Sequence, residues 1–173
     1  MPSVIVLRYG HRPKRDERVT THCCLVARAF GSDGIVIFGP KDEGIIKTIR
    51  SVVKRWGGSF SIEFKNSWLE EVKNLKKQGY KIVHLTMYGK PIENEIDKIR
   101  ENEKIGVIIG SKKVEARVYC ESDYNIAITK QPHSEIAALA VFLDWYFDGK
   151  ELKKEFHGAI IKAGEKKCKQ GLS

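Results

Sequence analysis

The sequence predicts an α/β protein in which a mostly parallel sheet is flanked by helices on both faces. Short runs of β-branched residues recur along the chain and alternate with segments whose apolar residues recur at helical spacing. Strands that alternate with helices of this size pair in parallel, and both faces of such a sheet are covered. At 173 residues the chain has room for one domain of ordinary size, which we assign to residues 1–149.

Six strands are expected, and the first is a short run of β-branched and apolar residues near the N-terminus. The expected strands cover residues 3–7, 34–38, 59–64, 81–85, 105–109 and 125–129. Ligands of parallel α/β sheets bind beyond the carboxyl ends of the strands. The ends of these six runs are therefore the expected location of a binding site.

The clearest helix lies between Asp42 and Gly57. Apolar side chains recur there at helical spacing from Ile45 to Trp56. Asp42 is a candidate N-cap, and the Gly57–Gly58 pair is a typical helix stop. This pattern predicts a helix that packs on the core.

Four further helices are expected, each with its own signal. Thr20 and Thr21 are candidate caps before an apolar stripe, Ser67 and Glu70 form a capping-box pattern, and Pro91 can open a helix. The last long helix has an inward stripe made of Ile136, Leu139, Ala140 and Leu143.

The composition favours an anionic partner. The formal net charge is +9, which suits a nucleic acid. A solvated, lysine-rich surface is the alternative that charge alone leaves open. The apolar runs are short and interrupted by charges, and no small-residue cleavage site follows the first residues. We therefore expect neither a membrane span nor a secretory signal, and a cytoplasmic location.

The cysteines give no support for a metal site or a disulfide framework. The four cysteines form no C-x-x-C pair. His22, Cys23 and Cys24 are consecutive, and consecutive helical residues point in different directions rather than toward one ion. We expect no metal, and reduced thiols that are mostly buried.

Beyond Gly149 the chain becomes strongly basic and reads KELKKEFHGAIIKAGEKKCKQGLS. Residues 156–161 can add one edge strand, and the remainder is expected to be a mobile tail. Residues 150–173 are therefore expected to form a basic C-terminal extension of the domain.

The strongest charge cluster lies at the end of the first expected strand. The chain has no G-x-G-x-x-G after that strand, no P-loop and no G-x-S-x-G elbow, so the commonest α/β activities lose their main support. The stretch RYGHRPKRDERVTTH instead offers arginine forks that match phosphate oxygens, although a solvated loop is the alternative. Its candidate RNA-binding residues are Arg8, Arg12, Lys14 and Arg15.

Two loops that follow strands can build a pocket from main-chain groups. Gly110 allows a ligand to approach the backbone closely, and Pro132 fixes the loop in ITKQPHSE. Side by side, two such loops would make a nucleoside site with apolar walls. At a third strand end, HLTMYG, Leu85 and Met87 can face a flat apolar ligand, although simple packing explains them equally well. Local residues alone favour a proline-set helix start that Ser134 caps.

Four segments of the chain resemble a known family when they are taken together. They are VLRYGHRPKRDERVTTHCCLVARAFGSDGIVI, VHLTMYG, VIIGSKKV and YNIAITKQPHSEIAALAVFLD. They resemble the archaeal tRNA cytidine-56 2′-O-methyltransferases, a branch of the SPOUT methyltransferases, and the similarity runs from residue 4 to about residue 161. Motifs of this length in the same order are far more specific than any single spacing.

The resemblance implies a SPOUT fold whose C-terminal part is threaded into a deep trefoil knot that holds S-adenosyl-methionine. It further implies tRNA as the substrate and a homodimer in which each site is completed across the interface. The last helix and the tail are then the expected dimer surfaces, which would use the aromatic cluster Trp145, Tyr146 and Phe147.

The resemblance also implies roles for individual residues. Arg18 is the expected catalytic residue that engages the reacting ribose. Arg28 is the alternative for that role and is otherwise expected to bind RNA. The residues expected to line the cofactor pocket are Leu85, Gly110, Ser111, Lys112, Lys113, Val114, Ile128, Thr129, Lys130, Gln131, Pro132, His133, Ser134 and Glu135.

The chain departs from the family pattern in three places. Lys112 stands where a glutamate is usual, Thr129–Lys130 replaces a Gly-Asn pair, and the tail stops early. The implied reaction is attack of a ribose 2′-oxygen on the methyl carbon of S-adenosyl-methionine, without a metal. A non-catalytic RNA-binding SPOUT protein and a SPOUT methyltransferase that acts on a base nitrogen are the two alternatives.

Overall fold

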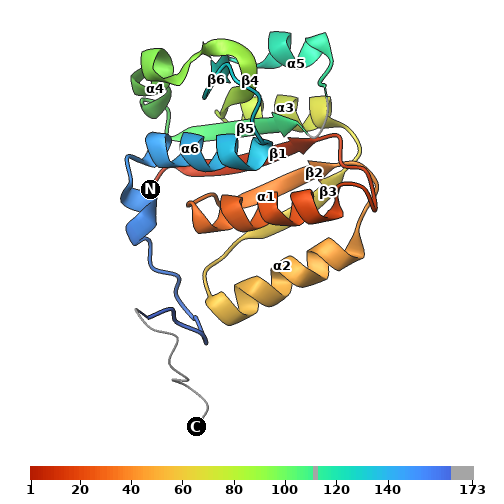
Figure 1. Ribbon diagram of the computed structural model, residues 1–173, viewed down its shortest axis with the longest axis vertical. Coiled ribbons are helices and arrows are strands. Elements are labelled where there is room, and N and C mark those ends of the chain that lie inside the picture. Colours follow the sequence, from red (N-terminus) through yellow and green to blue (C-terminus); the bar gives the residue numbers. More distant parts are fainter. Residues whose placement is uncertain (111–112, 165–173) are drawn as a thin grey trace.

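The protein is built around a six-stranded sheet in which the paired strands are parallel (Figure 1). The computed structural model describes residues 1–110 and 113–164, so the expected mobile tail lies outside the described residues from residue 165 on, with Cys168. The strand order is β3-β2-β1-β5-β4-β6. The strands are β1 (Ser3–Tyr9), β2 (Gly34–Phe38), β3 (Ser61–Lys65), β4 (Lys81–Pro91), β5 (Lys104–Gly110) and β6 (Tyr124–Ala127). The predicted α/β class and its six strands are confirmed.

The helices begin largely where local capping chemistry places them. The side chains of Asp42, Ser67 and Ser134 accept hydrogen bonds from backbone N–H groups in the first turns of α2, α3 and α6. The helices are α1 (Glu17–Ala29), α2 (Glu43–Trp56), α3 (Trp68–Lys77), α4 (Ile92–Arg100), α5 (Ala116–Glu121), α6 (Glu135–Phe147) and the 3₁₀ helix η1 (Lys150–Lys153). None of the helices in the described ranges is both long and apolar enough to cross a membrane.

The expected cap of the first helix is wrong. Helix α1 begins at Glu17, so Thr20 and Thr21 lie inside its first turns. The Thr21 hydroxyl donates to the Glu17 carbonyl at 2.8 Å, and the Thr20 hydroxyl accepts from a buried arginine side chain of β1. Both hydroxyls therefore have partners that a cap position would not offer.

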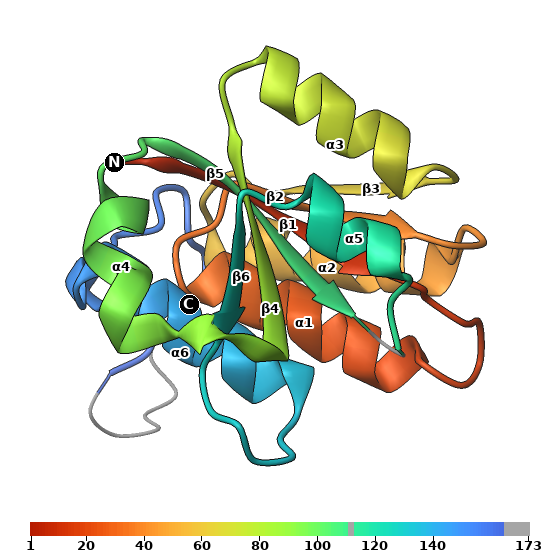
Figure 2. The same cartoon turned by 90° about the horizontal axis from the view of Figure 1, so that it is seen from above.

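The helices cover the sheet in two layers. Helices α1, α2, α4 and α6 pack on one face and α3 and α5 on the other, as Figure 2 shows. Side chains alternate along β1, so Val4 and Val6 enter the core with Cys23 of α1, whereas Leu7 packs with Val72 of α3. Burial on both faces explains why the strands read as continuous apolar runs.

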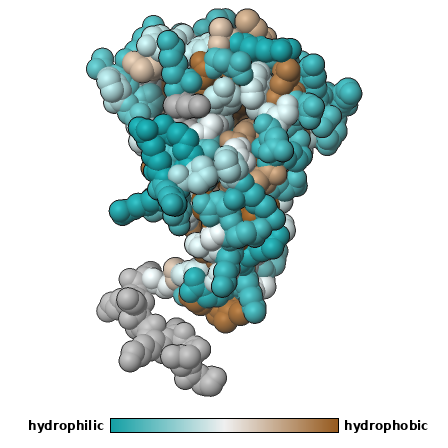
Figure 3. Space-filling view, turned by 90° about the vertical axis from the view of Figure 1, so that its right-hand side faces the viewer, coloured by the Kyte–Doolittle hydropathy of each residue, from teal (hydrophilic) through white to brown (hydrophobic). Residues whose placement is uncertain are grey.

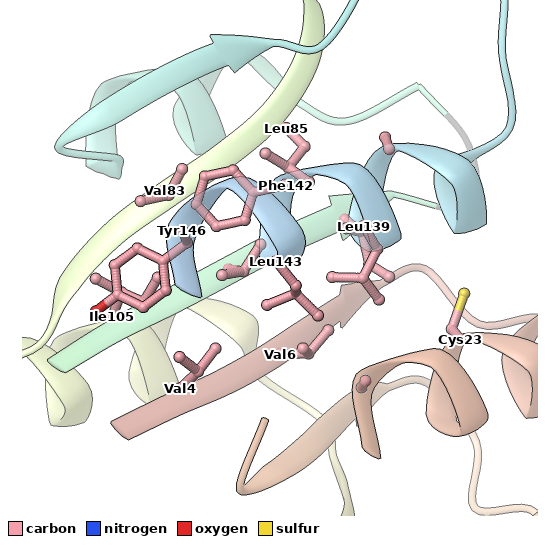
Figure 4. Close-up of a cluster of buried hydrophobic side chains, with 14 of the residues drawn as sticks. Val4, Val6, Cys23, Val83, Leu85, Ile105, Leu139, Phe142, Leu143 and Tyr146 are labelled. Atoms are coloured by element: carbon pink, nitrogen blue, oxygen red, sulfur yellow. The ribbon is translucent and has the colours of Figure 1, made fainter. Parts of the chain in front are cut away.

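Helix α6 supplies the centre of the larger core. Figure 4 shows Leu139, Phe142 and Tyr146 directed onto the sheet beneath the helix. Tyr146 and Phe147 are each 4% exposed, whereas Trp145 is 38% exposed. The expected aromatic dimer surface is therefore corrected, because two of its three side chains belong to the monomer core.

The expected edge strand over 156–161 does not form. This segment is irregular and lies against the C-terminal end of α2. There the Gly58 amide donates to the His157 carbonyl at 2.8 Å, and the Ile160 amide donates to the Arg55 carbonyl at 2.9 Å. These bonds satisfy backbone groups at a helix end, so the segment extends the domain beside α2 rather than at the sheet.

Candidate functional site

The carboxyl ends of all six strands meet at one edge of the sheet. The chain leaves β1 toward β2 on one side and leaves β5 toward β6 on the other, so the strand order reverses between β1 and β5. In open α/β sheets this reversal is where ligands bind. Figure 3 looks onto this edge, where hydrophobic surface shows between hydrophilic side chains in the upper half.

A cavity of about 600 Å³ opens at the ends of β4, β5 and β6. This size is ordinary for a small-molecule site. Seven residues that the sequence assigned to the cofactor pocket line it together: Leu85, Gly110, Lys113, Val114, Pro132, His133 and Glu135. The structure therefore brings together the two loops that were expected to lie side by side.

Five other residues assigned to the pocket lie outside the cavity lining. Ile128 packs against the larger core, the Thr129 hydroxyl accepts from the Gln131 amide at 3.2 Å, and Ser134 caps α6. The five are Ile128, Thr129, Lys130, Gln131 and Ser134. Local bonds therefore hold this loop, while Pro132 and His133 form the wall. The assigned residues Ser111 and Lys112 lie outside the described residues.

A strand irregularity shapes the wall formed by β4. Leu85 and Lys90 both pair with Ile126, so residues 86–89 bulge out of the ladder. Gly89 permits the bulge, because a Cβ atom there would lie 2.5 Å from the Asn125 carbonyl oxygen. The bulge carries Thr86, Met87 and Tyr88 into the cavity lining. Of these three, the sequence pointed only to Met87.

A second part of the wall was missed from the sequence because its partners are distant in the chain. The His84 ring stands edge-on to Tyr119 with 4.7 Å between ring centroids, and His84 Nδ1 lies 3.0 Å from Asn125 Oδ1. The Tyr119 and Thr86 hydroxyls are 2.9 Å apart. Burial lowers the pKa of His84, so its ring is neutral at neutral pH.

A buried ion pair joins the cavity to the start of α1. Arg8 is 0% exposed, and its Nη1 donates to Glu135 Oε1 at 2.7 Å. Its Nε donates to the Thr20 hydroxyl at 2.7 Å, and that hydroxyl lies 2.8 Å from His11 Nδ1. Burial and the charge of Arg8 lower the pKa of His11. One guanidinium therefore holds strand β1, helix α1 and the start of helix α6 together.

The predicted RNA-binding role of two arginines is corrected, because both side chains are buried. Arg8 is enclosed, as described, and Arg28 is 9% exposed at the C-terminal end of α1. Arg28 donates to the Gly57 carbonyl at 2.6 Å and lies over the Phe156 ring at 4.4 Å. These contacts fasten the segment after α6 to the domain, so Arg28 has a structural role. Arg28 also lies at the end of α1 remote from the carboxyl edge.

The other basic residues to which the sequence analysis gave a role lie at the carboxyl edge. Arg12 forms an ion pair with Asp16, with Nε 2.8 Å from Oδ2. Lys14 and Arg15 are exposed in the loop between β1 and α1, and Arg18 is exposed in the first turn of α1. This loop therefore presents positive charge at the carboxyl edge of the sheet.

The structure places the cysteine-rich stretch of α1 away from any metal-binding arrangement. Cys23 and Cys24 are buried, whereas His22 is exposed. Burial raises the pKa of both thiols to about 12. Within the described part of the chain, no three histidine, cysteine, aspartate or glutamate side chains are arranged to hold a metal ion.

The fold is that of the SpoU-type RNA methyltransferases. It is similar to the TrmH/SpoU tRNA modifying enzyme of A. aeolicus, with a TM-score of 0.63 and 13% identity over 88% of this chain and 77% of that one. It is also similar to the SpoU methyltransferase AviRb from Streptomyces viridochromogenes, crystallised in complex with AdoMet, with a TM-score of 0.62 and 13% identity over 85% of this chain and 57% of that one.

The sequence comparisons identify the family. A family model described as tRNA ribose 2'-O-methyltransferase, aTrm56, matches residues 56–171, and the chain belongs to this family. A tRNA (cytidine(56)-2'-O)-methyltransferase of Methanopyrus kandleri is 50% identical over 161 residues, which cover 93% of this chain and 90% of that protein. A protein of the same name from Methanothrix thermoacetophila is 53% identical over 157 residues, which cover 91% of this chain and 90% of that protein. The resemblance drawn from the sequence is confirmed.

We predict that Glu135→Ala lowers the free energy of unfolding by up to about 3 kcal/mol, because it leaves the buried charge of Arg8 without its carboxylate. Glu17→Ala is the matched control, since Glu17 also opens a helix but is exposed. Urea unfolding of both variants measures the difference. Equal losses would show that the ion pair adds nothing beyond a charge at a helix start.

Proposed function

We propose that this protein transfers a methyl group from S-adenosyl-methionine to the 2′-oxygen of cytidine 56 in tRNA. The observation that carries the proposal is the near-complete similarity to relatives of that name, at 50% and 53% identity. The similarity extends over nine-tenths of this chain and nine-tenths of each relative.

The cavity at the ends of β4, β5 and β6 fits the cofactor. Its volume of about 600 Å³ accommodates an adenosine with an amino-acid side arm. Leu85, Ile109 and Val114 offer apolar walls for a flat adenine, and the backbone at Gly110 and Pro132 lies in the lining. When bound, S-adenosyl-methionine supplies a methyl carbon activated by a positively charged sulfur.

The chain's own residues have to orient a weak nucleophile. A ribose hydroxyl is a weak acid, so it must be held in line with the methyl carbon while its developing negative charge is stabilised. Arg18 is exposed at the start of α1, and its guanidinium can donate to that oxygen. A guanidinium stays protonated, so Arg18 would act as a donor and not as a base.

The basic loop would hold the tRNA backbone. Lys14 and Arg15 are exposed there, and their charges suit phosphate oxygens. We also propose a cytoplasmic location, because that compartment holds tRNA. Residues 1–149 would form the catalytic domain and residues 150–173 a basic extension that adds further positive charge for RNA.

We further propose a homodimer and a deep trefoil knot in the C-terminal part of the fold. The family resemblance supports both. The exposed side chains of Val141 and Trp145 on α6 support a partner surface along that helix. Because Arg18 is exposed, a second chain would be able to bring its own Arg18 to the cavity and complete the site.

Methyl transfer from labelled S-adenosyl-methionine to unmodified tRNA, followed by mass mapping, tests the function. We expect the label on the ribose of cytidine 56. Arg18→Ala should lose about 100-fold or more of turnover while its cofactor affinity stays within about twofold, since it removes one donor to a developing oxyanion. Arg50→Ala, an exposed arginine of α2, is the control and should retain activity.

Three outcomes of that experiment would contradict the proposal. A label on a base nitrogen would identify the other class of SPOUT methyltransferase. Binding of tRNA without any transfer would identify a non-catalytic RNA-binding protein. Full turnover of Arg18→Ala would remove Arg18 from the mechanism.

We predict that tRNA affinity falls steeply with salt and that the loop from β1 to α1 accounts for part of the slope. Lys14→Ala/Arg15→Ala should reduce the slope of log K against log salt by about 1.5, because the variant loses two phosphate contacts and its binding releases fewer counterions. Lys77→Ala/Lys98→Ala removes two exposed charges at the amino edge and serves as the control. Filter binding between low and moderate salt measures the slope for both variants and for wild type. If Lys14→Ala/Arg15→Ala has the wild-type slope, the loop does not contact the phosphates.

A further inference from the structure

A second cavity, of about 310 Å³, opens on the other side of the strand reversal. It lies at the ends of β1, β2 and β3, and Tyr9, Trp68 and Glu115 line it. Nothing in the proposed cofactor site uses these three side chains. The volume suits a single nucleobase with part of its sugar.

The two cavities are immediate neighbours. Tyr9 pairs in register with Gly110, so one residue faces the second cavity while its partner lines the first. The short segment after β5 has the same arrangement, since Val114 lines the first cavity and Glu115 the second. A group bound in one cavity therefore lies next to a group bound in the other.

Two half-buried aromatic rings form one side of the second cavity. The rings of Tyr9 and Trp68 meet edge to face, with centroids 6.1 Å apart and an interplanar angle of 67°. Tyr9 is the last residue of β1, and Trp68 follows the cap of α3, so two rigid elements hold them. Flat aromatic rings of this kind bind unpaired bases by stacking.

The glutamate that faces these rings is held in one orientation. Glu115 Oε1 accepts from Trp68 Nε1 at 2.7 Å and from the Tyr9 hydroxyl at 3.4 Å. Burial and the charge of Glu115 raise the pKa of Tyr9, which keeps that hydroxyl a donor. No hydrogen bond to Glu115 Oε2 forms within the described residues, which leaves an acceptor beside the rings.

A carboxylate acceptor distinguishes the two pyrimidines. Cytosine carries an amino group at position 4 that donates to a carboxylate, whereas uracil carries an oxygen there that a carboxylate repels. The combination of stacking ring and oriented carboxylate is therefore a cytosine-selective arrangement, placed one strand away from the proposed methyl donor.

We propose that this second cavity receives the base of the nucleotide that is methylated, with the ring stacked on Trp68 and its 4-amino group donating to Glu115 Oε2. The proposal rests on the proposed function and adds the residues that choose the base. Splaying one base out of the RNA would place its ribose between the two cavities, where the 2′-oxygen meets the methyl group.

Methyl-transfer kinetics on two tRNA transcripts, one with cytidine and one with uridine at the target position, test this proposal. Wild type should prefer the cytidine transcript by about fivefold or more in kcat/KM. Glu115→Gln should reduce that preference, because a glutamine amide can also donate to the uracil oxygen. Glu121→Gln on α5 is the control and should keep the wild-type preference.

The stacking role has its own variants. Trp68→Leu should lose about tenfold or more in kcat/KM, and Trp68→Phe should restore most of it, because phenylalanine keeps a flat ring. The tRNA transcript should also quench the fluorescence of wild type, and the quenching should be weaker in Trp68→Phe. Trp56→Leu, at the end of α2, is the matched control.

These experiments distinguish a failure of the base-binding proposal from a failure of the proposed methyltransferase function. If wild type methylates tRNA but Trp68→Leu matches it, or Glu115→Gln keeps the full preference, the second cavity does not receive the base. If wild type transfers no methyl group, the proposed function fails and the base-binding proposal fails with it. Should Trp68→Leu not fold, Trp68→Phe and Glu115→Gln decide the question.

Discussion

The buried guanidinium of Arg8 is the constraint on which the carboxyl edge of this protein depends. A charge that is 0% exposed is tolerated only with close partners, and Arg8 binds Glu135 and Thr20, each at 2.7 Å. Glu135 is the first residue of α6, and Thr20 lies in the first turns of α1. This one side chain therefore joins the first strand to the starts of α1 and α6.

The parallel sheet then divides the edge into two compartments. Because the strand order reverses between β1 and β5, the loops on each side diverge and leave one cavity at the ends of β4 to β6 and another at the ends of β1 to β3. The residue pair Tyr9 and Gly110 marks the boundary. The two cavities therefore lie next to one another on opposite sides of this boundary.

The features that local chemistry determines, the helix caps and the strands, could be predicted from the sequence. The caps Ser67 and Ser134 were identified because each bonds to backbone three residues away, and the strands because buried strands are apolar throughout. Arg8 and Arg28 were misassigned as RNA contacts, because their buried partners lie far along the chain. The acceptor role of Glu115 and the wall around His84 were invisible for the same reason, since neither belongs to a periodic pattern.

Calorimetric titration with S-adenosyl-methionine tests the central claim that the cavity at the ends of β4, β5 and β6 holds the methyl donor. Val114→Trp fills that cavity, and Val52→Trp on α2 is a control of equal size change. We predict that wild type and Val52→Trp bind alike and that Val114→Trp binds about tenfold or more weakly. Equal affinity of all three proteins, or no binding to wild type, would contradict the account.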